Sequence, residues 1–451
     1  MKKQLSALLL VLLGTSATFG QTTITVTNTD DSGAGSLRQA VIDASNNDTI
    51  RLSPSLIAGG SDTIILGSQL TINKPLVIKG AYNGSDKLYV SGNDASRVFY
   101  CINSTGKVYL DSLAIINGYV SGNGGHGGGI NQNGSDTLYV TNCSIKHCEG
   151  NRGGGIFANN SKNIVIDNCD IQNNTGNQYG GGFGHQVQGF ARITNSTISN
   201  NITSGNGGGI NSLSGGVISN CVIENNATSF SRGGGVSFDL SQATHNALIT
   251  GCQISGNNAS RGGGVHNAGG NSSSDTLTII NSTISDNNGG VNGGGIWSQN
   301  AHLVVDRSTI YDNNGGQGGG GIYADWTVEV TYSTIVDNTA GNGAGIFQSV
   351  PSGTWLPYPV SLIENSTIVG NYSLGATGAI WSASIAVKNT TITENSGAGS
   401  ARVIYGVKTL SLENVTIYNN NDEPSPTTAI NCEVCDVTSS IISTEGASHF
   451  T

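Results

Sequence analysis

The sequence predicts an all-β protein whose chain coils into a single parallel solenoid. Glycine supplies 67 of the 451 residues and charged residues only 11%, whereas a typical globular protein has about 25% charged residues. Short runs of alternating apolar residues recur throughout the chain, and a glycine-rich unit repeats at steps of 24 to 34 residues. A repeat of this length, with no run long enough for a helix, is typical of stacked β-coils.

The first marker of the repeat is a glycine run that ends on an apolar residue, as in "GGGI" at 153–156. We call these apolar residues the anchors: Ile130, Ile156, Phe183, Ile210, Val236, Val265, Ile296, Ile322, Ile346 and Ile380. Glycine reaches positive φ at no steric cost, so each run is interpreted as a sharp turn. A phosphate-binding loop would need a helix after its glycines, but a strand-like run follows each time.

The second marker is an isoleucine that is followed three residues later by an asparagine. These asparagines are Asn174, Asn201, Asn226, Asn257, Asn287, Asn313, Asn338, Asn371, Asn395 and Asn420. Each unit also contains three short runs of alternating apolar residues, which predict three short strands. Stacked units of this kind lie about 4.8 Å apart. In such a stack the asparagines are predicted to form a hydrogen-bonded ladder at one turn.

The N-terminal end differs from the repeats. Residues 1–20 combine two lysines, an apolar run and small residues, which predicts a secretory signal peptide. Residues 21–50 are predicted to form an N-terminal cap, because Ser36 and Gln39 fit a capping box and open a short amphipathic helix. Such a helix would protect the first rung from edge pairing. Residues 51–451 are then predicted to form the β-helix.

With these motifs in place, the chain resembles right-handed parallel β-helix proteins of the pectate-lyase-like superfamily. The segment "DSGAGSLRQAVIDA" at 31–44 is similar to a segment of bacterial surface proteins, and the GGGI and I-x-x-N pairing resembles polymorphic outer membrane protein repeats. Those repeats carry Phe where this chain has the second Ile. The resemblance implies a single right-handed parallel β-helix of roughly 12–15 rungs with a short N-terminal capping helix. Because such folds host lyases, hydrolases, adhesins and inert stalks, the fold does not fix the function.

Two columns of side chains are the candidate binding residues. Arg232 and Arg261 stand four residues before their anchors on neighbouring rungs, where they can contact an acidic sugar. Aromatic residues follow the anchors directly on four successive rungs, as Trp297, Tyr323, Phe347 and Trp381. Since each anchor points inward, these rings are expected to point outward as an exposed stripe suited to sugar faces. Solvated turn residues and rings that merely stack on one another remain open as alternatives.

The sequence assigns no catalytic residues. Fragments similar to polygalacturonases, such as "NTD" at 28–30 and "RIT" at 192–194, do not fall on adjacent rungs, as the carboxylates of an inverting hydrolase must. Asp239 and Asp325 occupy equivalent positions, but three rungs apart. No aspartate cluster on matching rungs indicates the calcium that a lyase would need, so no metal and no cofactor is predicted, and calcium stays open as an alternative.

The cysteines fall into two groups. Cys143, Cys169, Cys221 and Cys252 share one corner column with serines. Buried thiols are the favoured interpretation, and disulfides between neighbouring rungs remain open. Cys432-x-x-Cys435 lacks a second pair or a histidine for zinc and is interpreted as structural.

The sequence favours a secreted or cell-surface β-helix that binds glycans or mediates adhesion without catalysis. The expected partner is a polysaccharide or a host or cell-surface glycan, outside or on the outer membrane of a Gram-negative bacterium. The alternatives are a polysaccharide lyase or glycoside hydrolase acting on acidic polysaccharide, and a structural spacer. A net charge of −10 without a basic stripe argues against nucleic acid, and no apolar run of membrane length follows residue 20.

Overall fold

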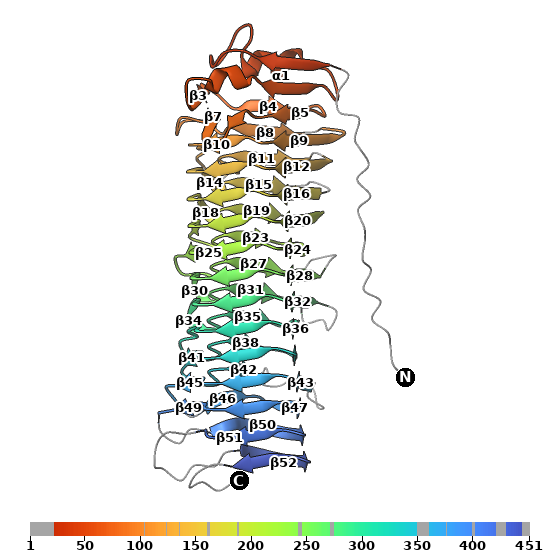
Figure 1. Ribbon diagram of the computed structural model, residues 1–451, viewed down its shortest axis with the longest axis vertical. Coiled ribbons are helices and arrows are strands. Elements are labelled where there is room, and N and C mark those ends of the chain that lie inside the picture. The colour runs from red at the N-terminus through yellow and green to blue at the C-terminus, as the bar shows by residue number, and fades with distance from the viewer. Residues whose placement is uncertain are drawn as a thin grey trace.

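The computed structural model describes residues 22–443, with gaps at 103, 123, 135, 160–162, 187–188, 242–245, 271–274, 350–359, 376, 399–401 and 421–429. The predicted signal peptide at 1–20 therefore lies outside the described residues. The described chain winds into one parallel β-solenoid of about 15 turns, which confirms the predicted fold class (Figure 1).

Each rung contributes up to four short strands, and each strand pairs in parallel with its equivalents in the neighbouring rungs. We number the resulting faces I to IV in chain order. Within the described residues, faces I and II form one 28-stranded sheet, face III a 16-stranded sheet, and face IV a six-stranded and a three-stranded sheet. The anchors from Ile130 to Ile346 each begin a strand of face I, whereas Ile380 lies inside the strand Thr377–Trp381.

Face I contains β4 (Leu70–Ile72), β8 (Phe99–Ile102), β11 (Ile130–Asn133), β15 (Ile156–Asn159), β19 (Phe183–Gln186), β23 (Ile210–Ser212), β27 (Val236–Asp239), β31 (Val265–Ala268), β35 (Ile296–Gln299), β38 (Ile322–Ala324), β42 (Ile346–Gln348) and β46 (Thr377–Trp381). Face II contains β1 (Thr23–Val26), β2 (Thr49–Leu52), β5 (Val77–Lys79), β9 (Lys107–Asp111), β12 (Thr137–Thr141), β16 (Asn163–Asp167), β20 (Phe190–Thr194), β24 (Gly216–Ser219), β28 (Ala247–Thr250), β32 (Thr276–Ile280), β36 (His302–Asp306), β39 (Val328–Thr331), β43 (Ser361–Glu364) and β47 (Ser384–Lys388). The longer β50 (Arg402–Glu413) and β52 (Ile430–Thr438) run through both faces.

Face III contains β3 (Asp62–Ile65), β7 (Asp86–Ser91), β10 (Ala114–Ile116), β13 (Ser144–Lys146), β17 (Asp170–Gln172), β21 (Thr197–Ser199), β25 (Val222–Glu224), β29 (Gln253–Ser255), β33 (Thr283–Ser285), β37 (Thr309–Tyr311), β40 (Thr334–Val336), β44 (Thr367–Val369), β48 (Thr391–Thr393), β51 (Thr416–Tyr418) and β53 (Ile441–Ser443). The short β6 (Tyr82–Asn83) pairs antiparallel with β7 as a hairpin. Face IV contains β14 (Glu149–Arg152), β18 (Thr175–Tyr179), β22 (Ile202–Thr203), β26 (Ala227–Thr228), β30 (Asn258–Arg261), β34 (Asn288–Asn292), β41 (Thr339–Ala340), β45 (Tyr372–Ser373) and β49 (Ser396–Gly397).

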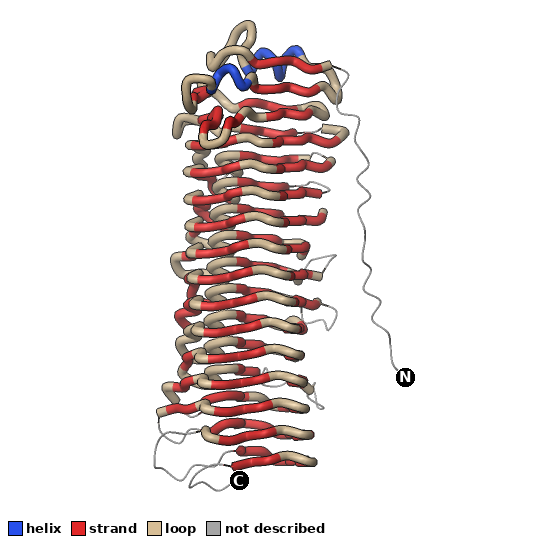
Figure 2. Tube along the Cα trace, in the orientation of Figure 1, coloured by secondary structure: helices blue, strands red, loops and turns tan. Residues whose placement is uncertain are grey.

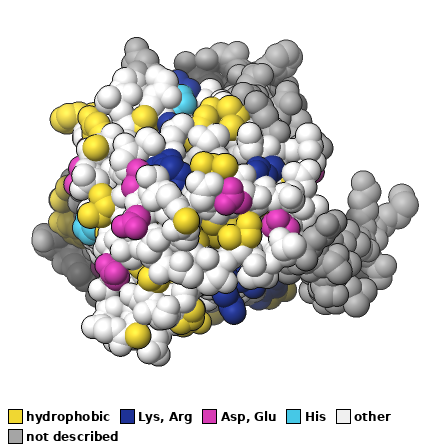
Figure 3. All heavy atoms as spheres, turned by 90° about the horizontal axis from the view of Figure 1, so that it is seen from above, with side chains coloured by type: hydrophobic (Ala, Val, Ile, Leu, Met, Phe, Trp, Pro, Cys, Tyr) yellow, Lys and Arg dark blue, Asp and Glu magenta, His cyan; other side chains and the backbone are white. Residues whose placement is uncertain are grey.

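Helix α1 (Leu37–Asp43) covers the N-terminal end of the stack, beside the short 3₁₀ turn η1 (Pro54–Ile57) (Figure 2). Ser36 caps α1 by accepting a hydrogen bond from Gln39 N, but the Gln39 side chain donates to Asp43, so only half of the predicted capping box forms. Seen from this end, apolar side chains are scattered among polar and charged ones (Figure 3). Neither helix of the described residues has the length or the apolar character to span a bilayer.

The stack begins earlier than the predicted boundary at residue 50. Strand β1 already pairs in register with β2, and β2 with β5, so the first coil and its cap share residues 22–50. The apolar face of α1 is buried against this coil through Leu37, Ala40 and Val41. The cap and the solenoid are therefore one continuous core.

The asparagine ladder runs along the inside of the turn between faces III and IV. Asn257, which is fully buried, accepts hydrogen bonds from the backbone N of Asn226 at 2.9 Å and from Asn226 Nδ2 at 3.1 Å. Its own Nδ2 donates to Ile223 O and to Asn287 Oδ1. The same bonds repeat from Asn174 to Asn420. Each asparagine therefore satisfies backbone groups that a buried turn would otherwise leave unpaired.

A second ladder occupies the corner between faces II and III. Ser308 Oγ accepts from the backbone N of Ser282 and donates to Asp306 O. Cys252 takes the same place, with its Sγ 3.5 Å from the backbone N of Cys221. Cys143, Cys169, Cys221 and Cys252 are all buried free thiols, as the favoured interpretation expected. These thiols substitute for serine hydroxyls.

The three glycines of each run serve two different purposes. Gly153 has a φ of +60°, which a residue with a Cβ rarely adopts. Gly154 and Gly155 are needed for close packing, because an added Cβ would lie 2.3 Å from Thr175 O and 2.7 Å from Gly182 O. The predicted positive φ thus applies to the first glycine, while the other two let neighbouring rungs approach.

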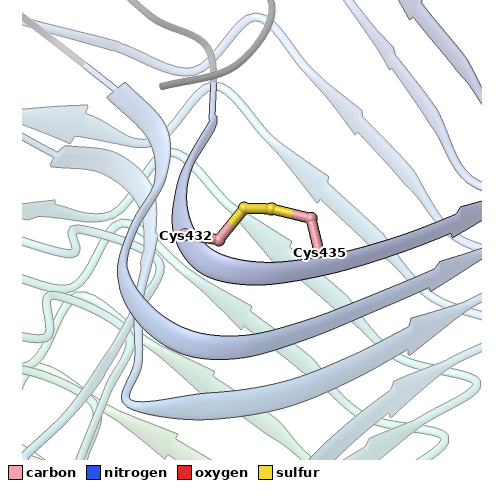
Figure 4. Close-up of a disulfide and its surroundings, with 2 residues drawn as sticks. All are labelled: Cys432 and Cys435. Carbon is pink, nitrogen blue, oxygen red and sulfur yellow. A yellow bond between two sulfur atoms is a disulfide. The ribbon is translucent and has the colours of Figure 1, made fainter.

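Cys432 and Cys435 form a disulfide within β52 (Figure 4). Cys432 is half-buried and Cys435 is exposed. This bond gives the pair the structural role that the sequence indicated.

Candidate functional site

The candidate site is a column of rings on the outer side of face I. In-register pairing places Trp297, Tyr323, Phe347, Trp381 and Tyr405 on five successive rungs. Tyr323 and Phe347 stack with ring centroids 5.0 Å apart, and Phe347 lies 5.2 Å from Trp381. We call these five residues the aromatic column.

Trp297 does not match the predicted exposed stripe. Its side chain is only 4% exposed, whereas the next three rings of the column are half-buried. The guanidinium groups of Arg232 and Arg261 lie over the Trp297 ring, 4.9 Å and 5.2 Å from its centroid. The prediction of an exposed Trp297 was therefore wrong, because the arginines of the preceding turns fold over it in cation–π contacts.

The two predicted columns thus converge on one cluster. Arg232 Nη1 donates a hydrogen bond to Gln299 Oε1 at 3.0 Å, so its side chain extends along the stack past one intervening rung. Burial, and secondly the charge of Arg261, lower the pKa of Arg232, whereas Asp239 and Asp325 act in the opposite direction. Both aspartates therefore influence this arginine although they stand three rungs apart.

Asp325 completes the cluster. Burial raises the pKa of its carboxyl group to about 6, against opposing contributions from Trp297, Arg261, Tyr323 and Arg232. The Trp297 indole N–H faces this carboxylate without a hydrogen bond of standard geometry. A carboxyl group of this pKa changes charge close to neutral pH, between two arginines and two aromatic rings.

A similar but smaller cluster precedes the aromatic column on face I. The His126 ring lies 4.7 Å from the ring of Phe157, and the Arg152 guanidinium lies 4.9 Å from the centroid of Tyr179. Burial, followed by the charges of Arg152 and Arg97, lowers the pKa of His126 to about 4. His126 is therefore neutral at physiological pH.

Buried polar atoms without a protein partner collect along the same side of the solenoid. They are His126 Nδ1, Asn131 Oδ1, the Tyr179 hydroxyl, Asn211 Nδ2, Arg261 Nε, His266 Nε2 and Trp297 Nε1. Each belongs to a residue one place after or four places before an anchor. Unpaired buried groups are uncommon, and water or a ligand usually supplies their partner. Because these atoms are themselves buried, they lie beneath the surface that a ligand on this side would contact.

Four members of the site were not predicted as binding residues, although Asp325 was named as a position equivalent to Asp239. Tyr405 extends the column but follows Ile404 in "RVIYG", which lacks the glycine marker. His266 lies 4.8 Å from the Trp297 ring; its place directly after an anchor was the available signal. Asp325 and Gln299 stand three residues after their anchors, and their role depends on how far the arginines reach. Within the described residues, no group of three or more histidines, cysteines or acids could hold a metal ion.

Fold and site together define a parallel β-helix with a ring-lined face. Residues 99–277 and 189–356 match the family model for the right handed beta helix region. These matches span more than half of the chain, so the protein belongs to this family. Among solved structures, the crystal structure of pectate lyase Pel9A is similar at 14% identity and a TM-score of 0.35, over 85% of this chain and 80% of that chain. No curated protein matches the chain.

Proposed function

We propose that the protein is a secreted or cell-surface β-helix that binds polysaccharide without catalysis along the aromatic column. The observation that carries the proposal is the run of rings on five successive rungs, ending at one side in the Arg232–Arg261–Asp325 cluster. Half-buried rings present flat apolar faces, and sugar rings present matching C–H faces. The repeat of about 4.8 Å between rungs suits an extended polymer lying along the stack.

The polar cluster beside the rings supplies the hydrogen bonds that orient a sugar. The half-buried guanidinium groups of Arg232 and Arg261 over the Trp297 ring are donors, and Asp325 is an acceptor once its proton has left. An arginine beside an aromatic ring also suits the carboxylate of an acidic sugar. The proposed partner is thus a polysaccharide or host or cell-surface glycan that carries acidic units.

Export is part of the proposal. The N-terminal signal-like segment and the Cys432–Cys435 disulfide fit an oxidising compartment. The likeness of the repeats to polymorphic outer membrane proteins, and of residues 31–44 to bacterial surface proteins, supports a place outside the cell or on the outer membrane.

A glycan array on the purified protein tests the proposal. The wild type is expected to bind acidic polysaccharide fragments, and a double variant Trp297→Ala, Trp381→Ala is expected to lose that binding. Tyr139→Ala is the matched control, because Tyr139 stacks on Tyr109 with centroids 4.5 Å apart on face II, away from the column. Absence of wild-type binding, or equal loss in the control variant, would leave a structural spacer as the better account.

A polysaccharide lyase or hydrolase is the second candidate, favoured by Asp325. A carboxyl group with a pKa of about 6 can exchange a proton at neutral pH, and Arg261 lies beside it. Release of unsaturated uronides from pectin by the wild type, and its loss in Asp325→Asn, would establish a lyase. Binding without any product release supports the non-catalytic proposal.

A further inference from the structure

Two pairs of thiols lie on neighbouring rungs at the corner between faces II and III. In-register pairing of β12 with β16 and of β13 with β17 places Cys143 and Cys169 at equivalent positions of two successive rungs. The pairing of β24 with β28 and of β25 with β29 does the same for Cys221 and Cys252. All four are free thiols. The corner therefore holds two sulfur pairs, each one rung apart, which is about 4.8 Å.

The two thiols of each pair lie within hydrogen-bonding reach of one another. Burial, followed by a hydrogen bond to the Cys169 thiol and the charge of that group, raises the pKa of Cys143 well above its usual range. A hydrogen bond to Cys252 raises the pKa of Cys221 in the same way. Cys143 Sγ also accepts a hydrogen bond from the Leu113 backbone N at 3.4 Å, so this sulfur keeps a donor when its own proton leaves.

The two pairs differ in how a solute reaches them. Cys143 and Cys169 belong to the lining of a cavity of about 410 Å³ that opens to solvent. Their side chains are only 2% and 4% exposed, so they form the floor of this cavity, where a bare cation fits and an organic ligand does not. Neither Cys221 nor Cys252 belongs to this lining. The second pair is therefore a built-in comparison for the first.

The number and kind of ligands select the ion. Thiolates are soft ligands, which favour Cu(I) and zinc over magnesium and calcium. Structural zinc takes four ligands, but in the described part of the chain no third histidine, cysteine or acid joins two others in a metal-binding group. Cu(I) needs only two thiolates. A metal–thiolate bond is about 2.3 Å long, so two such bonds join sulfurs up to about 4.6 Å apart, which is close to one rung.

The charges around the pair also suit a cation. Lys87 lines the same cavity, but the side-chain charge that reaches Cys143 from outside the pair is the carboxylate of Asp111. A negative charge beside the sulfurs favours the binding of a positive ion.

We propose that Cys143 and Cys169 form a binding site for one Cu(I) ion, which enters through the cavity. Both thiols lose their protons to solvent as the ion binds, so that two S–Cu bonds replace two S–H bonds and no electron is transferred. The bound ion joins two neighbouring rungs and stabilises the folded stack. The site shares no residue with the aromatic column and does not depend on the proposed binding of polysaccharide.

Anaerobic titration of the purified full chain with Cu(I), in competition with the chromophoric chelator bicinchoninate, tests this inference. Thiol reductants are left out, so that Cys432 and Cys435 stay joined and take no metal. We expect one Cu(I) per chain and a higher thermal unfolding midpoint with the ion bound. Cys143→Ser and Cys169→Ser should each weaken binding by about a hundredfold or more. Both variants should fold, because serine occupies this corner on other rungs, as at Ser308.

Cys221→Ser is the matched control, because it removes a thiol from a pair with the same hydrogen bond but no place in the cavity lining. It should bind Cu(I) as the wild type does, and Zn(II) should bind the wild type more weakly than Cu(I). The inference is overturned if the chelator keeps all the Cu(I), if Cys143→Ser binds like the wild type, if Cys221→Ser loses the ion, or if Zn(II) binds as tightly.

Discussion

Replacement of Asn257 by alanine is expected to destabilise the solenoid from within. In the native ladder, Asn257 Oδ1 accepts from two donors of the rung before it, the Asn226 backbone N–H and the Asn226 side-chain amide. Alanine removes this acceptor and leaves both donors buried, since Asn226 is fully buried. The other amide hydrogen of Asn226 keeps its bond to Ile198 O.

The size of the effect follows from these two orphaned donors. A buried polar group left without a partner costs about 1–3 kcal/mol, so Asn257→Ala is expected to lower the free energy of unfolding by about 2–6 kcal/mol. The loss is concentrated near the altered rung, because a solenoid is held together mainly by contacts between nearest neighbours.

Guanidinium denaturation followed by circular dichroism measures the change, and hydrogen exchange of the segment that holds Asn226 locates it. Asn258→Ala is the matched control, because Asn258 is the next residue, is exposed and should change stability by less than about 0.5 kcal/mol. If Asn257→Ala and Asn258→Ala denature at the same midpoint, with equal exchange at Asn226, the ladder does not stabilise the stack as argued.

Three further changes follow from the same structure. Gly154→Ala should lower the free energy of unfolding by about 1–3 kcal/mol, because the added Cβ would lie 2.3 Å from the carbonyl oxygen of Thr175. Gly124→Ala is the control and should not destabilise the protein, because the space around Gly124 is open. Equal denaturation midpoints for the two variants would refute the close-packing argument. Cys252→Ser should keep wild-type stability and Cys252→Ala should lose about 1–3 kcal/mol, since only serine preserves an acceptor at this corner; a thermal scan that ranks the two in the opposite order would contradict it. Burial raises the folded-state pKa of Asp325 to about 6 from a normal 3.8, so its protonated form adds stability that is complete below about pH 3.8 and lost as the pH rises through 6. Relative to the Asp325→Asn variant, the free energy of unfolding of the wild type should fall by about 1–2 kcal/mol over this window. A difference in denaturation midpoints that stays constant between pH 4 and pH 7 would show that Asp325 titrates normally.

The repeat predicted the fold because each marker depends on a local physical requirement. An inward anchor such as Ile156 fills the core, Asn174 satisfies a buried turn, and Gly153 adopts positive φ. Once two markers recur in fixed order, parallel stacking in register is the arrangement that satisfies all of them at once. The start of the solenoid was less predictable, since β1 and β2 lack both markers but still pair as its first rungs.

The sequence predicted where the candidate site lies, but not which side chains contact one another there. Strand alternation placed Trp297 on the outer side of face I correctly, but its burial depends on the side chains of Arg232 and Arg261. Long flexible side chains reach across rungs, and the sequence spacing does not say in which direction. For the same reason Asp325 looked isolated three rungs from Asp239, whereas the structure brings its charge close enough to Arg232 to affect the pKa of that group.

The dependence of affinity on oligosaccharide length tests the central claim, that successive rungs form one continuous binding face. The half-buried and stacked rings from Tyr323 to Tyr405 occupy four rungs at about 4.8 Å each, so affinity for acidic oligosaccharides should rise with each added sugar up to roughly four units and then level off. Equal affinity for a monosaccharide and a tetrasaccharide, or no binding at any length, would contradict the account.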